Sequence, residues 1–418
     1  MSTFLTKAVK WKEVRQATEY IMAVASVDKR LKNKGLSAFT TQQERVEKFV
    51  AALEEDAKES SFADFQSKTQ DLDILATICY ASVKVPLYNE KAVEWIRGPA
   101  MTDDDAKKLN LRVLGVLARD NATDTYYIVF RGTDVDLRSG ELMISTGQAS
   151  KGDVMNLNNK DQMSLDKMFN LSGVIDADCG AGRASLGNFL NAQIYYKDAN
   201  GKTELLLDSL NAQFKKLVDL IPEKSNVKVY AHSMGTSVAG SLLLALGTCG
   251  KDFKSKEALY LGPYGACNRK AGQIITNEFG GPINSVMNED DFVSRMNTFA
   301  GALYPMLLSD GALDKYKCLA FIKEHMARGA ENYPYGLYGD VYAFHAPNYF
   351  TRPWFNHLVT TYRLAACKAV SEGSLAKIDA TSTHEITYVD ERGDVVYLED
   401  EELRAISKEL NERSCMDI

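Results

Sequence analysis

One stretch of the sequence decides the fold: Val227-Lys-Val-Tyr-Ala-His-Ser-Met-Gly235. Its first five residues are mostly apolar and β-branched, and they predict a short buried strand. Residues 236–246, which follow, are rich in alanine, serine, glycine and leucine and predict a helix. A strand that turns sharply into a helix lifts the residue at the turn above the sheet. The sequence puts Ser233 at that turn.

Ser233 therefore has the setting of a catalytic nucleophile. The sharp turn needs small residues two positions before and after the serine, and these are Ala231 and Gly235. Acyl transfer needs a hydroxyl in such a place, next to a base and to main-chain N–H groups that face the developing oxyanion. The alternative is an ordinary strand–helix turn in which the serine only caps the helix.

Strands and helices alternate around this stretch. Residues 111–118 and 125–130 are β-branched runs joined by a polar turn, and they predict adjacent antiparallel strands. Residues 257–261 and 283–287 predict two more buried strands. Strands that alternate with helices indicate a mostly parallel sheet flanked by helices, which is the α/β class.

Helices are predicted elsewhere. Residues 1–70 have little strand pattern, and Thr41-Gln-Gln-Glu44 is a capping box, so two or three helices are expected there. A helix over 206–221 is predicted to end at Pro222. A further amphipathic helix is predicted from the spacing of Leu72, Leu75, Ala76, Cys79 and Tyr80.

Composition excludes several classes of protein. The chain has 418 residues, of which 45% are hydrophobic and 25% charged, as in an ordinary globular protein. Its net charge is −7 and no long basic stripe occurs, so no nucleic-acid partner is expected. Seven scattered cysteines without a Cys-x-x-Cys pair predict neither a disulfide framework nor a zinc site.

Four stretches carry a resemblance to a known family: Tyr127-Ile-Val-Phe-Arg-Gly-Thr133, the Ser233 turn, Tyr260-Leu-Gly-Pro-Tyr-Gly-Ala-Cys-Asn268 and Val286-Met-Asn-Glu-Asp-Asp-Phe-Val-Ser-Arg295. In this order they resemble the class 3 (fungal-type) lipases, over about residues 72–370. The resemblance implies an α/β-hydrolase fold with a mostly parallel central sheet. It also implies that Asp291 is the catalytic acid, and that the main-chain N–H groups of Met234 and Thr133 bind the oxyanion.

The resemblance leaves the catalytic histidine between two positions. In the family this histidine opens a late helix and is followed by an aromatic residue, which His357 matches. His345, in an aromatic segment upstream, is the alternative. The order Ser233, Asp291, His357 is also the chain order that hydrolases of this fold use.

The resemblance implies a carboxylic-ester hydrolase that acts on acylglycerols or phospholipids through an acyl-enzyme, with transient contact to a membrane or lipid surface. No cofactor and no metal are needed for this chemistry. The same triad also serves thioesterases, short-chain esterases and acyltransferases. A further alternative, from another class, is a non-catalytic hydrolase-fold binding protein, such as a secreted bacterial effector.

Three regions are expected along the chain. Residues 1–70 form a helical N-terminal extension, and residues 71–374 form the catalytic domain, with a lid or insertion at about 134–185. Residues 375–418 form a hairpin, at about 384–398, and an acidic helix. No secretory signal is found and no transmembrane segment is expected, because the longest apolar run (238–246) is shorter than the roughly 20 residues of a membrane span. The protein is expected in the cytoplasm, or exported without a classical signal peptide.

Overall fold

The structure, a computed structural model, describes residues 9–59, 72–83, 100–132, 175–176, 183–184, 193–263, 269–288, 291, 294, 338–344, 357–368, 376–378, 387–389 and 395–397. The predicted lid at 134–185 lies outside these residues, except for β5 (Ile175–Asp176) and β6 (Arg183–Ala184), which pair antiparallel. The predicted acidic helix near the C-terminus also lies outside them. The predicted C-terminal hairpin is confirmed, because β14 (Thr387–Val389) pairs antiparallel with β15 (Val395–Tyr397).

The main element is an eight-stranded sheet in the order β1-β3-β4-β9-β10-β11-β12-β13. Its middle is parallel from β4 to β12, whereas β1 and β3 at one end and β13 at the other run antiparallel to their neighbours. The strands are β1 (Leu72–Val83), β3 (Leu109–Asp120), β4 (Thr125–Phe130), β9 (Asn226–Ser233), β10 (Ser255–Pro263), β11 (Ile283–Asn288), β12 (Asp340–Phe344) and β13 (Ala376–Ile378). A smaller sheet joins β2 (Met101–Thr102), which follows directly into α5 (Asp103–Ala106), with β7 (Ile194–Lys197) and β8 (Thr203–Leu207).

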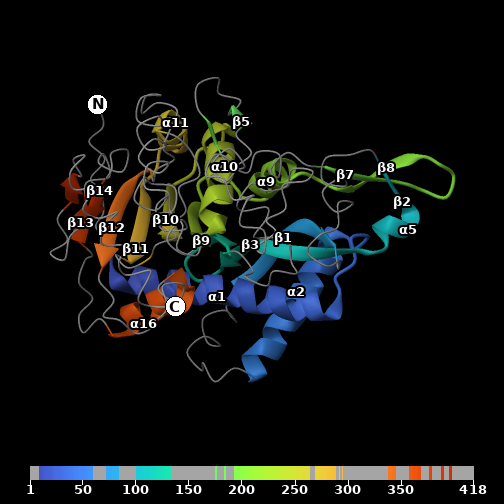
Figure 1. Ribbon diagram of the computed structural model, residues 1–418, viewed down its shortest axis with the longest axis horizontal. Coiled ribbons are helices and arrows are strands. Elements are labelled where there is room, and N and C mark those ends of the chain that lie inside the picture. The colour runs from blue at the N-terminus through green and yellow to red at the C-terminus, as the bar shows by residue number, and fades with distance from the viewer. Residues whose placement is uncertain are drawn as a thin grey trace, which may run out of the picture.

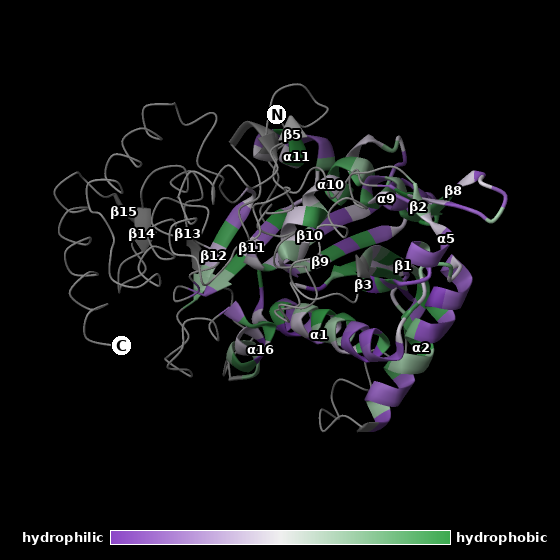
Figure 2. Ribbon diagram, turned by 45° about the vertical axis from the view of Figure 1, so that its right-hand side comes forward, coloured by the Kyte–Doolittle hydropathy of each residue, from purple (hydrophilic) through white to green (hydrophobic). Residues whose placement is uncertain are grey.

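Helices cover both faces of the main sheet (Figure 1). One face carries α9 (Leu210–Asp219), α10 (Met234–Thr248) and α11 (Arg269–Phe279). The other face carries α1 (Trp11–Lys34), α2 (Gln42–Glu59) and α16 (Val359–Lys368). Figure 2 shows the apolar residues of the strands between these two layers. This mostly parallel sheet, with helices on both faces, is an α/β-hydrolase fold, as the sequence predicts.

Apolar side chains that alternate along the strands contribute to a hydrophobic core on each face of the sheet. In β4, Tyr126, Ile128 and Phe130 pack with α9 and α10, whereas Tyr127 and Val129 pack on the α1 face. Successive side chains of a strand point to opposite faces, so a strand that is buried on both faces is apolar throughout. This explains why the strand stretches in the sequence are nearly continuous apolar runs.

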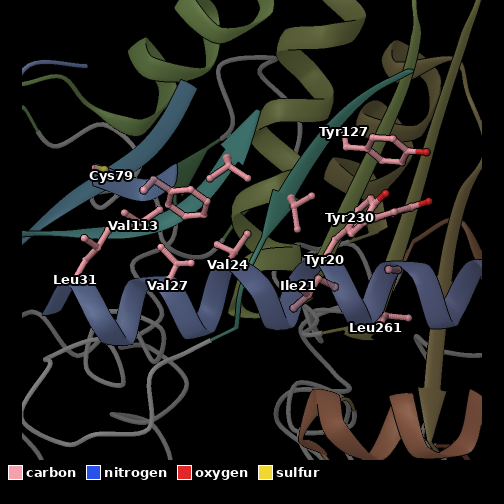
Figure 3. Packing of buried hydrophobic residues seen from close by; sticks show 14 of the residues in the cluster. Tyr20, Ile21, Val24, Val27, Leu31, Cys79, Val113, Tyr127, Tyr230 and Leu261 are labelled. Atoms are coloured by element: carbon pink, nitrogen blue, oxygen red, sulfur yellow. The ribbon is translucent and has the colours of Figure 1, made fainter. Parts of the chain in front are cut away.

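The long helix α1 lies under the centre of the sheet. Ile21, Val24, Val27 and Leu31 lie on its sheet-facing side, and each is at most 4% exposed (Figure 3). Burial of one such side chain contributes about 1.5–3 kcal/mol. The helix ends at Gly35, whose φ of 71° and N–H bond to the Leu31 carbonyl close the last turn. The first helix of the chain is therefore part of the core that supports the sheet.

The predicted capping box is present at the start of α2. The Glu44 main-chain N–H donates to the Thr41 hydroxyl, and the Thr41 main-chain N–H donates to the Glu44 carboxylate at 2.7 Å. The prediction for residues 206–221 is correct only in part. Its helix α9 begins at Leu210, because Ser209 caps it and the preceding residues belong to β8.

The helix predicted through Leu72 to Tyr80 is wrong, because this segment is the edge strand β1. Its pairing with β3 contains two bulges, between Ile74 and Ala76 and between Ile78 and Cys79. The extra residue is Leu75 of β1 at the first bulge and Leu114 of β3 at the second. The strand is buried on both faces, since Ala76 and Tyr80 pack in one core and Cys79 in the other. Its apolar residues therefore include spacings of three and four, which resemble one face of a helix.

Candidate active site

The candidate site is built around the turn between β9 and α10. The strand lies between β4 and β10 and ends at Ser233, and α10 begins at Met234. Ser233 has φ 53° and ψ −128°, a conformation that residues with a side chain rarely adopt. The Thr236 hydroxyl donates to the Ser233 carbonyl at 2.6 Å and helps hold this turn. The strained residue is the one whose hydroxyl the sequence identifies as the nucleophile.

Two glycines let the end of β4 approach this turn. A Cβ atom on Gly235 would lie 2.5 Å from the Arg131 carbonyl oxygen. A Cβ atom on Gly132 would lie 2.5 Å from His232 Nδ1 and 3.1 Å from Ser233 Cβ. Atoms this close cannot coexist, so both positions need glycine. The sharp turn and the strand exit at 130–132 therefore interlock.

His357 connects Ser233 to Asp291. His357 Nε2 lies 2.7 Å from Ser233 Oγ, and His357 Nδ1 lies 2.8 and 2.9 Å from the two carboxylate oxygens of Asp291. A carboxylate only accepts hydrogen bonds, so Nδ1 carries the proton in the neutral ring and Nε2 accepts from the serine hydroxyl. All three side chains are buried. This is the geometry of a nucleophile, a base and a carboxylate that orients the base.

Asp291 accepts further hydrogen bonds. The Tyr362 hydroxyl donates to Oδ2 at 2.7 Å, and the Ser294 hydroxyl donates to the same oxygen at 2.9 Å. Burial by itself raises the pKa of Asp291. The positive charge of protonated His357 and the bonds from His357, Tyr362 and Ser294 oppose burial, and the net pKa lies below its ordinary value. The carboxylate therefore stays charged beside the histidine.

Tyr362 also ties the acid to the end of β11. Its hydroxyl accepts the main-chain N–H of Asn288 at 3.1 Å. Its ring is fully buried, and burial together with the charge of Asp291 raises the pKa of Tyr362 well above its ordinary value. The phenol therefore remains a proton donor to the carboxylate.

Gly262, at the end of β10, lies close to the histidine and the carboxylate. Its φ is 51°, and a Cβ atom there would lie 3.1 Å from Asp291 Oδ2 and 3.2 Å from His357. A side chain at this position would be strained and would also press on both groups.

The structure describes four of the six site residues predicted from the sequence. It brings Ser233, His357 and Asp291 together, and it makes Met234 the first residue of α10. The N–H groups of the first helical turn, that of Met234 included, have no carbonyl partner within the helix. Thr133 and His345 lie outside the described residues.

Sequence reasoning missed the residues that support this group: His232, Tyr362, Ser294 and Gly262. Tyr362 carried a weak signal, because an aromatic residue was expected a few positions after the histidine. Gly262 lies in one of the quoted motifs but has no reactive group. Nothing in the sequence marks Ser294 as a neighbour of the acid. His232 carries no signal of its own, because a residue beside the nucleophile on a strand is expected to point to the opposite face.

A second buried polar cluster lies behind the strand exit. Asp28 of α1 accepts from Arg112 at 2.5 Å and from Arg131 at 3.1 Å, and also from the Val113 N–H at 2.8 Å. Arg131 in turn donates to the Val113 carbonyl at 2.7 Å and to the Gly132 carbonyl at 2.8 Å. Helix α1 is therefore connected to the segment that lies against Ser233.

Two features are absent from the part of the chain that the structure describes. No group of His, Cys, Asp and Glu side chains within it has the arrangement of a metal site. No helix within it has the length and apolar character needed to span a membrane.

Comparisons with known proteins give structural neighbours only. No protein-family model matches the chain, and no curated protein matches it. The Rhizomucor miehei triacylglyceride lipase is similar with 13% identity and a TM-score of 0.38, over 81% of this chain and 82% of that one. The M37 lipase is similar with 14% identity and a TM-score of 0.41, over 76% and 81%. Lipase II from Rhizopus niveus gives 13% identity and a TM-score of 0.33, over 70% and 78%. These values identify neither a family nor a substrate.

Proposed function

We propose that the protein is a serine hydrolase that cleaves carboxylic esters of lipids. The observation that carries this proposal is the hydrogen-bonded series Ser233, His357, Asp291 at a strained strand–helix turn. Such a series is suited to acyl transfer, because the base takes the hydroxyl proton as the nucleophile attacks.

The reaction has two halves. In the first, His357 Nε2 takes the proton of Ser233, the hydroxyl oxygen attacks the ester carbonyl, and the proton passes to the leaving alcohol. In the second, His357 deprotonates a water molecule, which attacks the acyl-enzyme and releases the fatty acid. Asp291 stabilises the protonated imidazole in both halves. The main-chain N–H groups of Met234 and Thr133 are proposed to bind the oxyanion.

The lipid substrate rests on the four motifs that resemble class 3 lipases. Acylglycerols and phospholipids are both within this proposal, as is transient contact with a lipid surface. A thioesterase, a short-chain esterase and an acyltransferase use the same triad and remain alternatives. The proposed location is the cytoplasm, or outside the cell after export without a classical signal.

Covalent labelling tests the nucleophile. The wild type is expected to react with a fluorophosphonate probe, and the Ser233→Ala variant is expected not to react. Ser255→Ala is a matched control, since Ser255 is a serine on the neighbouring strand β10 whose hydroxyl donates to the Asn226 side chain at 3.0 Å. An unlabelled wild type, or a labelled Ser233→Ala variant, contradicts the proposal.

Product analysis tests the substrate. Purified wild type is incubated with mixed membrane lipids and with triacylglycerol emulsions, with Ser233→Ala as the control. Release of free fatty acid by the wild type alone supports a lipid-ester hydrolase. Labelling without fatty-acid release, together with activity on thioesters or soluble short-chain esters, favours the corresponding alternative.

A further inference from the structure

His232 is a buried residue that touches the candidate site from behind. It lies directly before Ser233 on β9, and its ring centroid is 4.9 Å from that of His357, with 31° between the ring planes. Its Nε2 atom lies 2.8 Å from the main-chain carbonyl oxygen of His357. His232 therefore contacts the main chain of His357, and the side chain of His357 contacts Ser233.

The hydrogen bond fixes the state of the His232 ring. A carbonyl oxygen only accepts, so Nε2 must carry the proton and donate it. Burial, followed by the charge of His357, lowers the pKa of His232 to about 3. The ring therefore stays neutral while His357 gains and loses its proton, and it does not compete for that proton.

The other edge of the same ring faces the strand exit. A Cβ atom on Gly132 would lie 2.5 Å from His232 Nδ1, so the Gly132 main chain is packed directly against the ring. Arg131 holds the Gly132 carbonyl from the opposite side at 2.8 Å. The His232 ring thus lies between two segments that both adjoin Ser233. One contains Gly132 and precedes the proposed oxyanion donor Thr133, and the other carries the base His357.

We propose that His232 is a positioning residue, which holds the main chain of His357 and the Gly132 segment in place on two sides of Ser233. This inference rests on the proposed function. Asp291 orients the imidazole of His357 through Nδ1, but this bond does not fix the main chain that carries the ring. His232 supplies that second attachment. Displacement of a catalytic group by about 1 Å lowers the rate about a hundredfold.

Three substitutions separate the hydrogen bond from the volume of the ring. His232→Phe keeps an aromatic ring but has no donor. His232→Gln has an amide nitrogen as many bonds from Cα as Nε2, so it reaches the His357 carbonyl. His232→Asn has its amide nitrogen one bond nearer to the main chain and does not reach it. The Gln and Asn variants form a matched polar pair if the Phe variant does not fold.

The measurements are kcat and KM on a chromogenic ester, the rate of labelling by a fluorophosphonate, and the thermal midpoint. We expect His232→Phe and His232→Asn to lower kcat and the labelling rate about a hundredfold with KM changed little. We expect His232→Gln to restore both to within about tenfold of the wild type. A residue with a structural role alone would lower the thermal midpoint and leave the kcat of the folded enzyme unchanged.

Two results overturn the inference. One is a folded His232→Phe variant with the kcat and labelling rate of the wild type. The other is an equal loss in the Gln and Asn variants. If the wild type itself is neither labelled nor active, the proposed function fails and the inference fails with it. If the wild type is labelled and Ser233→Ala is not, a result that contradicts the inference leaves the proposed function standing.

Discussion

Two buried polar clusters among the described residues look alike by burial and hydrogen bonding. One, the triad cluster, contains Ser233, His357, Asp291, Tyr362 and His232. The other, the arginine cluster, contains Asp28, Arg112 and Arg131. Both adjoin Gly132, which lies against His232 on one side and accepts a hydrogen bond from Arg131 on the other.

The two clusters differ in what their members can do with protons. An arginine stays charged at any pH that a protein survives, so Arg112 and Arg131 cannot take or release a proton during a reaction. In the triad cluster an imidazole, both of whose nitrogens can carry a proton, lies between a hydroxyl and a carboxylate. Burial and hydrogen bonding are therefore common to both clusters. What distinguishes the triad cluster is a titratable pair next to a hydroxyl on strained backbone, which is the arrangement that the proposed function requires.

The largest effect is expected in the triad cluster. Asp291→Asn keeps the size of the side chain but removes the charge that selects the His357 tautomer, so kcat is expected to fall about 10⁴-fold. Steady-state kinetics measures this, with circular dichroism to check the fold. A loss of less than about tenfold would assign Asp291 to structure, like Asp28.

The second largest effect is expected in the arginine cluster, where it is an effect on stability and not on kcat. Asp28→Asn leaves two buried arginines without their carboxylate, and the free energy of unfolding is expected to fall by about 3–5 kcal/mol. Urea unfolding measures it. The control is Asp56→Asn, which removes an Arg30 partner between α1 and α2 but leaves Arg131 untouched. Equal losses of unfolding free energy in the two variants would show that Asp28 contributes no more to stability than Asp56 does.

The two clusters are also expected to differ in how they make the stability of the protein depend on pH. The pKa of His232 in the fold is about 3, below its ordinary value of 6.5, so the unfolded chain binds a proton that the folded protein excludes. His357 and Asp291 are the titratable groups that act on it. Stability is therefore expected to fall by a few kcal/mol as the pH drops from 6.5 toward 3. In His232→Gln this part of the fall is expected to disappear, while Asp28→Asn is expected to keep it. Unfolding curves at several pH values decide.

The smallest effect is expected from one hydroxyl. Tyr362→Phe removes a donor to Asp291 but leaves His357 and Ser294 in place, so about 1.5 kcal/mol of stability and about tenfold in kcat are expected to be lost. The pKa of Asp291 is expected to rise toward its ordinary value, because a bond that lowered it is gone. An unchanged kcat would place Tyr362 outside the machinery of the triad cluster.

Much of the fold and of the candidate site was predictable from motifs whose residues are close in the sequence. The strand–turn–helix at Ser233 and the strands beside it follow from apolar runs and a small residue on each side of the serine. Asp291 and His357 came from the resemblance, and the structure places them within hydrogen-bonding distance of each other.

The remainder depends on packing that a single sequence does not show. His232 and His357 are 125 positions apart, and only the fold brings the ring of one to the carbonyl of the other. Asp28 likewise meets Arg112 across 84 positions. Strand β1 was predicted wrongly because it is apolar on both faces and contains an extra residue at Leu75, so its apolar residues include the spacing of a helix.

The left-handed backbone at Ser233 also bears on how such a protein could lose its activity. A residue with a side chain costs of order 1–3 kcal/mol at such a φ, whereas glycine costs far less. Ser233→Gly is thus expected to unfold at a higher temperature than Ser233→Ala, although both lack the hydroxyl. In a lineage freed from the demand for turnover, drift toward glycine at position 233 would make the protein sturdier. A serine at this position therefore lowers stability, which is consistent with the catalytic role proposed for its hydroxyl.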